Sequence, residues 1–137
     1  MIALFLAAGA AGGCVSIDGP PDQRAGLSCV DDSPECISRR QATLGALVAD
    51  KDRKWVHETA TPEAYASGVR LMALKSKRYE LSCDELARGR KEADGAGAVL
   101  RGAGNRLTPA QISRGTMLAA EVSRELRAEL SRRCKRT

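Results

Sequence analysis

Four helix-start signals constrain the fold of this chain more than any other feature of its sequence. At two of them a hydroxyl residue is followed directly by proline and glutamate, which supply a cap, a first helical residue and an acidic first turn. At the other two, glutamate or glutamine stands three positions after the hydroxyl residue, which is the pattern of a capping box. The signals predict helices that begin at Ser33, Thr61, Ser82 and Thr108.

Apolar residues recur every three or four positions after each signal, as the buried face of an amphipathic helix requires. The last helix should run for about 26 residues. A short turn at residues 102–105 precedes it, so the last two helices should be antiparallel neighbours. Gly89, Ala93 and Gly97 lie four residues apart and permit a neighbouring helix to approach closely. We therefore predict an all-α fold: a small four-helix domain with an antiparallel C-terminal helical hairpin.

The hydrophobic core of such a domain must be built mainly from aliphatic side chains, because aromatic residues make up only 3% of the sequence. A thin core in a small domain often needs covalent cross-links. The charged segment 50–54 interrupts the first helical pattern, and Trp55 and Val56 follow it. We expect this pair to fold back onto the domain, because tryptophan offers the largest apolar surface.

The N-terminal segment has the character of an export signal. The first seventeen residues carry no charged side chain, and the apolar run 1–11 is shorter than the roughly 20 residues that span a bilayer. Its length fits the apolar region of a signal peptide. No basic residue precedes this run, so we expect that the true start lies upstream or that the chain is trimmed.

The segment from Ala10 to Cys14 reads Ala-Ala-Gly-Gly-Cys and resembles the lipobox of bacterial lipoproteins. Ala11 stands where leucine is usual in that motif. The resemblance implies cleavage after residue 13, acylation of the Cys14 sulfur and, because Val15 follows rather than aspartate, sorting to the periplasmic face of the outer membrane. Plain export with a free Cys14, to a soluble periplasmic or secreted form, is the alternative.

Three regions follow from this interpretation: a signal peptide at 1–13, a lipid-anchored flexible tether at 14–28 that contains Gly19-Pro20-Pro21-Asp22, and a helical domain at 29–137. The domain also resembles a group of uncharacterised exported proteins from proteobacteria. No motif transfers a role from that group to this chain.

The cysteine count agrees with export. Cys14 would carry lipid, which leaves Cys29, Cys36, Cys83 and Cys134 to form two disulfides. Four cysteines allow three connectivities, and sequence alone does not choose between them. Antiparallel packing of the last two helices would bring Cys83 close to Cys134, and Cys29–Cys36 would then close a short loop before the first helix.

Metal binding and catalysis find little support in the sequence. Cys29 and Cys36 are further apart than the usual zinc-ligand pair, and His57, the single histidine, has no partner at ligand spacing. His57 and Glu58 are neighbours in the chain, and adjacent residues rarely face one site. No nucleophile-elbow or phosphate-loop motif is complete. We therefore predict no metal, no cofactor and no enzymatic activity, with an unseen hydrolase as the remaining alternative.

The basic C-terminal part indicates which partners suit the domain. Residues 108–137 hold seven basic and three acidic side chains, and the chain ends in a basic tail at 132–136. We expect Glu121 to pair with Arg124, and Glu129 to pair with Arg132 or Arg133. Scarce aromatic residues and export argue against nucleic acid. We predict a non-catalytic cell-envelope lipoprotein that meets the membrane through its anchor and an envelope protein, anionic lipid or polysaccharide through its helices; the alternative is a secreted inhibitor or binding partner of an envelope enzyme.

Overall fold

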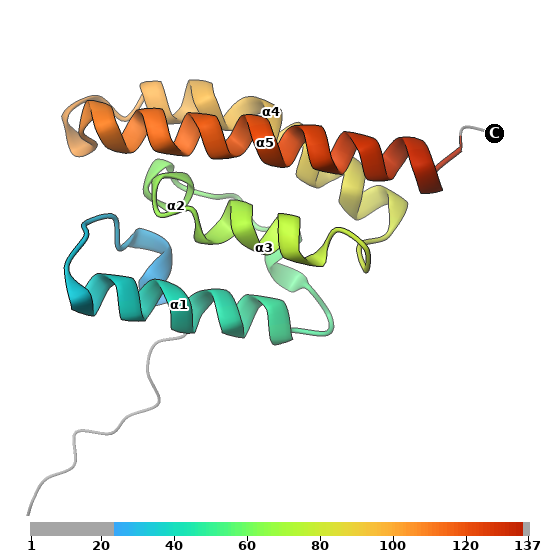
Figure 1. Ribbon diagram of the computed structural model, residues 1–137, viewed down its shortest axis with the longest axis horizontal. Helices are drawn as coiled ribbons and strands as arrows, with labels where there is room; N and C mark the ends of the chain where they lie inside the picture. Colours follow the sequence, from blue (N-terminus) through green and yellow to red (C-terminus); the bar gives the residue numbers. More distant parts are fainter. Residues whose placement is uncertain (1–23, 136–137) are drawn as a thin grey trace, which may run out of the picture.

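The computed structural model describes residues 24–135 of the 137-residue chain, and every regular element in this part is helical. The all-α prediction is confirmed. Figure 1 shows five α-helices joined by short connections. They are α1 (Pro34–Ala49), α2 (Pro62–Ala66), α3 (Val69–Lys77), α4 (Cys83–Arg101) and α5 (Pro109–Arg133), with 3-10 turns η1 (Ala25–Ser28), η2 (Lys54–His57) and η3 (Gly104–Arg106).

The helices begin where the sequence predicts. Ser33, Thr61, Ser82 and Thr108 are all N-caps, and each side chain accepts a hydrogen bond from a backbone N–H in the first turn. The capping boxes at α4 and α5 are complete, because Glu85 and Gln111 also accept from the backbone N–H of their caps. These bonds satisfy N–H groups that a bare helix end would leave without partners.

One predicted helix is two in the structure. The segment after Thr61 ends its first helix at Ala66, and α3 begins at Val69. Gly68 between them has a φ of +77°, in the left-handed region that glycine adopts at little cost. The Ser67 hydroxyl donates to the carbonyl of Ala64, which helps to end α2. The domain therefore has five α-helices rather than four, and α3 runs in its own direction.

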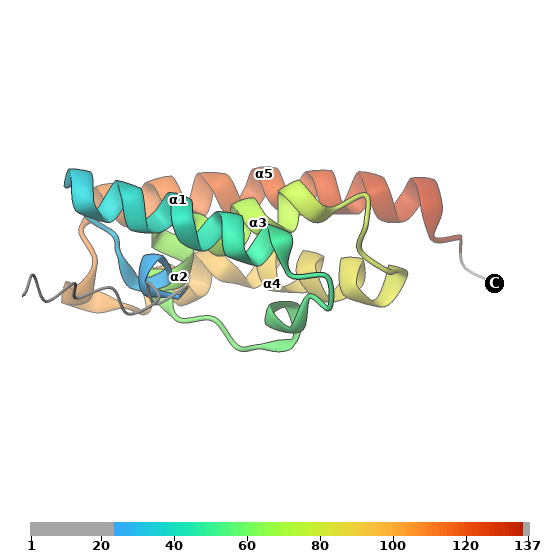
Figure 2. The ribbon, with the colours of Figure 1, turned by 90° about the horizontal axis from the view of Figure 1, so that it is seen from below.

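The helices stack in three layers. Figures 1 and 2 show α4 and α5 side by side as an antiparallel hairpin, with α1 on the far side of the domain. The short helices α2 and α3 lie between them: α3 contacts α1 and α5, and α2 contacts η1 and both helices of the hairpin. The predicted C-terminal hairpin is confirmed, and its inner face forms one wall of the core.

Small residues let the layers approach closely. A side chain on Gly89 would lie 3.0 Å from a methyl carbon of Leu74, and one on Gly115 would lie 2.8 Å from Leu100. Trp55 is 1% exposed and donates its indole N–H to the carbonyl of Leu47 at 2.9 Å, so the expected return of this residue to the core is confirmed. The rest of the core is mainly leucine, valine and alanine.

The folded domain begins before Cys29, which corrects the boundary of the predicted tether. Residues 14–23 lie outside the described part, but Ala25–Ser28 form η1, which packs on α1. Gly26 is buried, and its N–H donates to the hydroxyl of Thr43 at 2.9 Å. Nothing in the sequence indicates that Thr43 contacts Gly26. The composition of residues 14–28 therefore indicated a linker over the whole segment.

Candidate functional site

The four cysteines of the domain are joined as two disulfides. Cys29 pairs with Cys36 and Cys83 with Cys134, with Cα–Cα distances of 5.4 and 5.7 Å. The second bridge ties the start of α4 to the end of α5, as the antiparallel hairpin predicts. Cys14, the predicted lipidation site, lies outside the described residues, as does the predicted signal peptide at 1–13.

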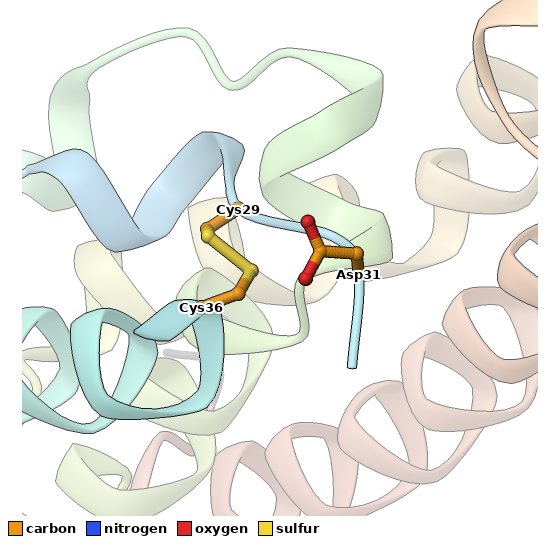
Figure 3. A group of neighbouring side chains, drawn as sticks. All are labelled: Cys29, Asp31 and Cys36. Atoms are coloured by element: carbon orange, nitrogen blue, oxygen red, sulfur yellow. A yellow bond between two sulfur atoms is a disulfide. The ribbon is translucent and has the colours of Figure 1, made fainter. Parts of the chain in front are cut away.

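Within the described part of the chain, the only group of three potential metal ligands consists of Cys29, Asp31 and Cys36, and its two cysteines form the first disulfide. Figure 3 shows the bonded sulfurs of Cys29 and Cys36, with the Asp31 carboxylate beside them. Both sulfurs are used in the bridge, and a metal would need them as thiolates. Asp31 accepts a hydrogen bond from the Ser33 N–H at 2.8 Å, and the bonds from Ser33 lower the pKa of this carboxyl. The disulfide and the Asp31–Ser33 bond therefore close the short loop before α1.

A shallow hollow surrounds His57, which we call the His57 hollow. It has a volume of about 350 Å³ and lies between residues 56–60 and one side of α4. Two carboxylates, Glu58 and Glu92, share the hollow with the imidazole. This arrangement is the one that a histidine-based hydrolase would need, so the state of the two carboxylates decides what the hollow can do.

Both carboxylates of the His57 hollow are already engaged by arginines. Glu58 accepts from two guanidinium nitrogens of Arg24, and this bond, against the opposing effect of partial burial, lowers the pKa of Glu58. Glu92 accepts from Arg70 Nε at 2.7 Å and from Nη2 at 2.9 Å. An arginine that bonds to both oxygens of a carboxylate takes up the acceptor atoms that could otherwise orient a histidine. Neither Glu58 nor Glu92 is therefore left to pair with His57 in this hollow.

Arg70 is the centre of the most buried polar network in the described chain. The residue is 3% exposed, and its guanidinium also donates to the backbone carbonyls of Trp55 and Glu58. Its charge lies 5.6 Å from the centre of the Trp55 ring, within cation–π range. The network fixes the loop after η2 against α3 and α4. Its role is to hold the fold, and it offers no open position to a ligand.

The candidate binding site lies on the hairpin. A groove of about 400 Å³, here called the α4–α5 groove, is lined only by residues of α4 and α5. Because α1, α2 and α3 all lie on the other side of the hairpin, the groove faces away from the rest of the domain. Its lining includes buried small residues such as Ala93 and Ala119, and the exposed arginines Arg101, Arg124 and Arg127.

The acid of the α4–α5 groove is largely committed to other groups. Asp94 accepts a hydrogen bond from the buried hydroxyl of Ser123 and lies 3.5 Å from Arg90. Its distance to Arg127 is 3.9 Å, at the limit of an ion pair. Arg101 and Arg124 make no hydrogen bond and no ion pair with a described residue. The groove therefore has an excess of positive charge.

The basic residues that the sequence singled out have other roles. Arg132 and Arg133 both bond to Glu129, as predicted, and Arg133 also donates to the carbonyl of Leu81 at 2.7 Å. Arg136 lies outside the described residues. The expected ion pair between Glu121 and Arg124 is not formed: Glu121 bonds to Lys75 of α3, which is the main cause that lowers the pKa of Glu121, and the Arg124 charge acts on it only as a weaker influence. The Arg124 side chain lines the groove.

Comparison with protein-family models, curated proteins and solved structures finds no match for this chain. Sequence reasoning missed the α4–α5 groove. The signal that could have found it is the arginine content of the facing helices, because an antiparallel hairpin brings Arg101 of α4 and Arg124 and Arg127 of α5 to one groove.

Proposed function

We propose that the protein is a non-catalytic cell-envelope lipoprotein that presents a disulfide-stapled helical domain for binding. The observation that carries this proposal is the pairing of the cysteines. Cys29, Cys36, Cys83 and Cys134 form two bridges within one domain, so Cys14 is the one cysteine left over. Disulfides persist in oxidising compartments outside the cytoplasm, and a single leftover cysteine next to an apolar leader suits an acylated anchor.

The direction in which the chain joins the domain supports presentation. Near the start of the described chain, η1 packs mainly on α1 and also contacts α2 and α3 (Figure 1). An anchor that precedes η1 would therefore hold the domain from the α1 side, with the α4–α5 groove on the opposite side. None of the helices in the described part combines the length and apolar content needed to cross a bilayer. Attachment would depend on lipid at Cys14, on the periplasmic face of the outer membrane.

A binding role accounts for the charged residues better than a hydrolytic role does. Glu58 and Glu92 are the carboxylates nearest to His57 in its hollow, and arginines engage both of them. By contrast, Arg101 and Arg124 line an open groove whose single acid, Asp94, bonds to Ser123 and pairs with Arg90. A surface of this kind suits anionic lipid, polysaccharide or an acidic face of an envelope protein.

Intact mass measurement of the membrane-extracted protein tests the proposal. We expect loss of residues 1–13, addition of acyl chains to Cys14, and a gain on reduction of one pair of hydrogens for each of two bridges. A Cys14→Ser variant is the matched control, and it should leave the membrane fraction with both bridges intact. Recovery of the native protein from the cytosol with five free thiols would overturn the proposal. Capture of one stoichiometric envelope enzyme would favour the alternative, a secreted inhibitor.

A further inference from the structure

Arg101 and Arg124 line the α4–α5 groove from opposite helices. In an α-helix, side chains lean toward the N-terminus of their own helix. Because α4 and α5 are antiparallel, Arg101 near the end of α4 and Arg124 in the middle of α5 lean in opposite directions along the groove. The structure shows this for Arg101, whose Nη1 lies 3.2 Å from the place where a side chain on Gly97 would begin.

Gly97 is the residue that gives the Arg101 guanidinium its space. A Cβ at this position would also lie 3.5 Å from the methyl group of Thr116 on α5, so glycine leaves the groove floor open between the helices. Thr116 contributes a buried hydroxyl oxygen that has no hydrogen-bond partner among the described residues. That oxygen is buried and the Thr116 methyl group is what faces Gly97, so the groove offers a ligand an open space and the Arg101 guanidinium.

The charges in this groove call for an anion with more than one negative charge. Three guanidinium groups line it, whereas its single acid, Asp94, already bonds to Ser123 and Arg90. One arginine satisfies a carboxylate through two parallel bonds. Guanidinium groups from two helices suit a tetrahedral group with three acceptor oxygens, and arginine geometry matches phosphate.

We propose that the α4–α5 groove is a phosphate-binding site, with Arg101 and Arg124 as its principal ligands and Arg127 as a third. The phosphate is either free or carried on a lipid headgroup or a sugar. Both guanidinium groups donate hydrogen bonds to its oxygens, and Arg127 leaves Asp94 to join them. The site belongs to the folded domain alone, so it does not depend on lipidation of Cys14.

Titration of the full-length chain with inorganic phosphate tests this site, followed by the backbone and arginine side-chain N–H signals in nuclear magnetic resonance. Phosphate should shift the signals around Gly97, Arg101 and Arg124 at constant ionic strength, and acetate should not. Arg101→Gln and Arg124→Gln should each weaken phosphate binding by about tenfold, the cost of one charge-assisted hydrogen bond.

Arg88→Gln is the matched control for these variants. Arg88 is also exposed on α4 and also lacks an ion pair, but it lies beside the His57 hollow. Its loss removes the same charge and should leave phosphate affinity unchanged. If all three variants bind phosphate equally weakly, the effect is one of net charge alone. If acetate shifts the same signals as phosphate does, the groove does not select phosphate. Either result overturns the proposal.

The source of the phosphate is decided by two further probes. Vesicles of phosphatidylglycerol and phosphatidylcholine test a lipid headgroup, with pure phosphatidylcholine as the neutral reference. Glucose 6-phosphate tests a phosphorylated sugar. Binding to anionic vesicles that Arg101→Gln abolishes assigns the site to a headgroup, whereas binding of the sugar phosphate alone assigns it to a soluble or polymeric source. No shift with any of the three probes overturns the proposal, and the mass measurement on Cys14 would be unaffected.

Discussion

Arg70 and Glu92 form a bidentate ion pair in the interior of the domain, with N–O distances of 2.7 and 2.9 Å. The Arg70 side chain is 4% exposed and that of Glu92 is 11% exposed. Arg70 belongs to α3 and Glu92 to α4, and the same guanidinium donates to the carbonyls of Trp55 in η2 and of Glu58 just after it. One side chain thus joins three segments that are far apart in the sequence.

Replacement of Arg70 by methionine should destabilise the domain strongly. The change keeps much of the side-chain volume but leaves the Glu92 charge buried and two carbonyls without their donor. Loss of one partner from a buried ion pair costs about 3–5 kcal/mol in the free energy of unfolding. Urea unfolding followed by circular dichroism measures the effect. Arg88→Met, on the exposed side of α4, is the control and should change stability by less than about 0.5 kcal/mol.

Two glycines should respond in opposite directions to the same substitution. A side chain on Gly26 would begin 2.5 Å from the hydroxyl oxygen of Thr43 and would also meet the backbone of Arg39. Gly26→Ala should therefore detach η1 from α1 and lower the unfolding free energy. Gly45 lies inside α1, and a Cβ added there would meet no other side chain or segment within 4 Å. Gly45→Ala should therefore raise the unfolding free energy by about 1 kcal/mol through helix propensity. Equal effects of the two substitutions would mean that η1 does not dock as described.

The sequence predicted the parts of this fold that depend on local chemistry. Hydroxyl caps, capping boxes and the stripe along α5 are set by residues within one or two turns, so their helix starts were correct to the residue. The Cys83–Cys134 bridge followed from the antiparallel register of one hairpin. The break at Gly68 was missed because a single glycine within an apolar pattern does not announce a left-handed conformation.

Features that depend on contacts between distant segments were not predictable. Nothing near Arg70 in the sequence indicates that it would be buried, because its partners lie on η2 and on α4. Likewise, the sequence places Glu121 and Arg124 one turn apart on the same helix, but in the packed structure Lys75 of α3 is the residue that pairs with Glu121. The positive charge of the groove results from this competition between partners, which only the packed structure decides.

The two disulfides should contribute unequally to stability. Cys83–Cys134 joins residues 51 apart in the sequence, whereas Cys29–Cys36 joins residues 7 apart. In the chain-entropy model, the longer loop stabilises by about 4 kcal/mol and the shorter by about 2.5 kcal/mol. Thermal unfolding of the two double-serine variants, without reductant, should therefore show the larger fall in Tm for Cys83→Ser with Cys134→Ser. A larger fall for the short bridge would assign most of the stabilisation to packing around η1.

Tyr65 should make folding sensitive to high pH. Burial, followed by the nearby Glu92 charge, raises the pKa of this phenol from 10.0 to about 12. The unfolded chain would lose the proton near pH 10, while the folded protein keeps it, so stability should fall as the pH rises from about 10 to about 12. The ultraviolet absorbance of tyrosinate measures the ionisation. Tyr65→Phe should remove the part of the tyrosinate titration near pH 12. If that part persists in the variant, another group is responsible for it.

Glu85 should contribute to the loss of stability in acid. Burial would raise the pKa of this carboxyl, but bonds from the Ser82 N–H and from Arg53 outweigh burial and hold the pKa below its ordinary value of 4.5. Protons therefore bind the unfolded chain first, so the stabilisation is complete above about pH 4.5 and is lost as the pH falls through the lower folded value. Glu85→Gln keeps an acceptor for the Ser82 N–H but has no charge for Arg53. Its unfolding free energy should be lower than that of the native chain at pH 7 and should approach it in acid; a constant difference between the two across this range would show that the charge of Glu85 is not what stabilises the start of α4.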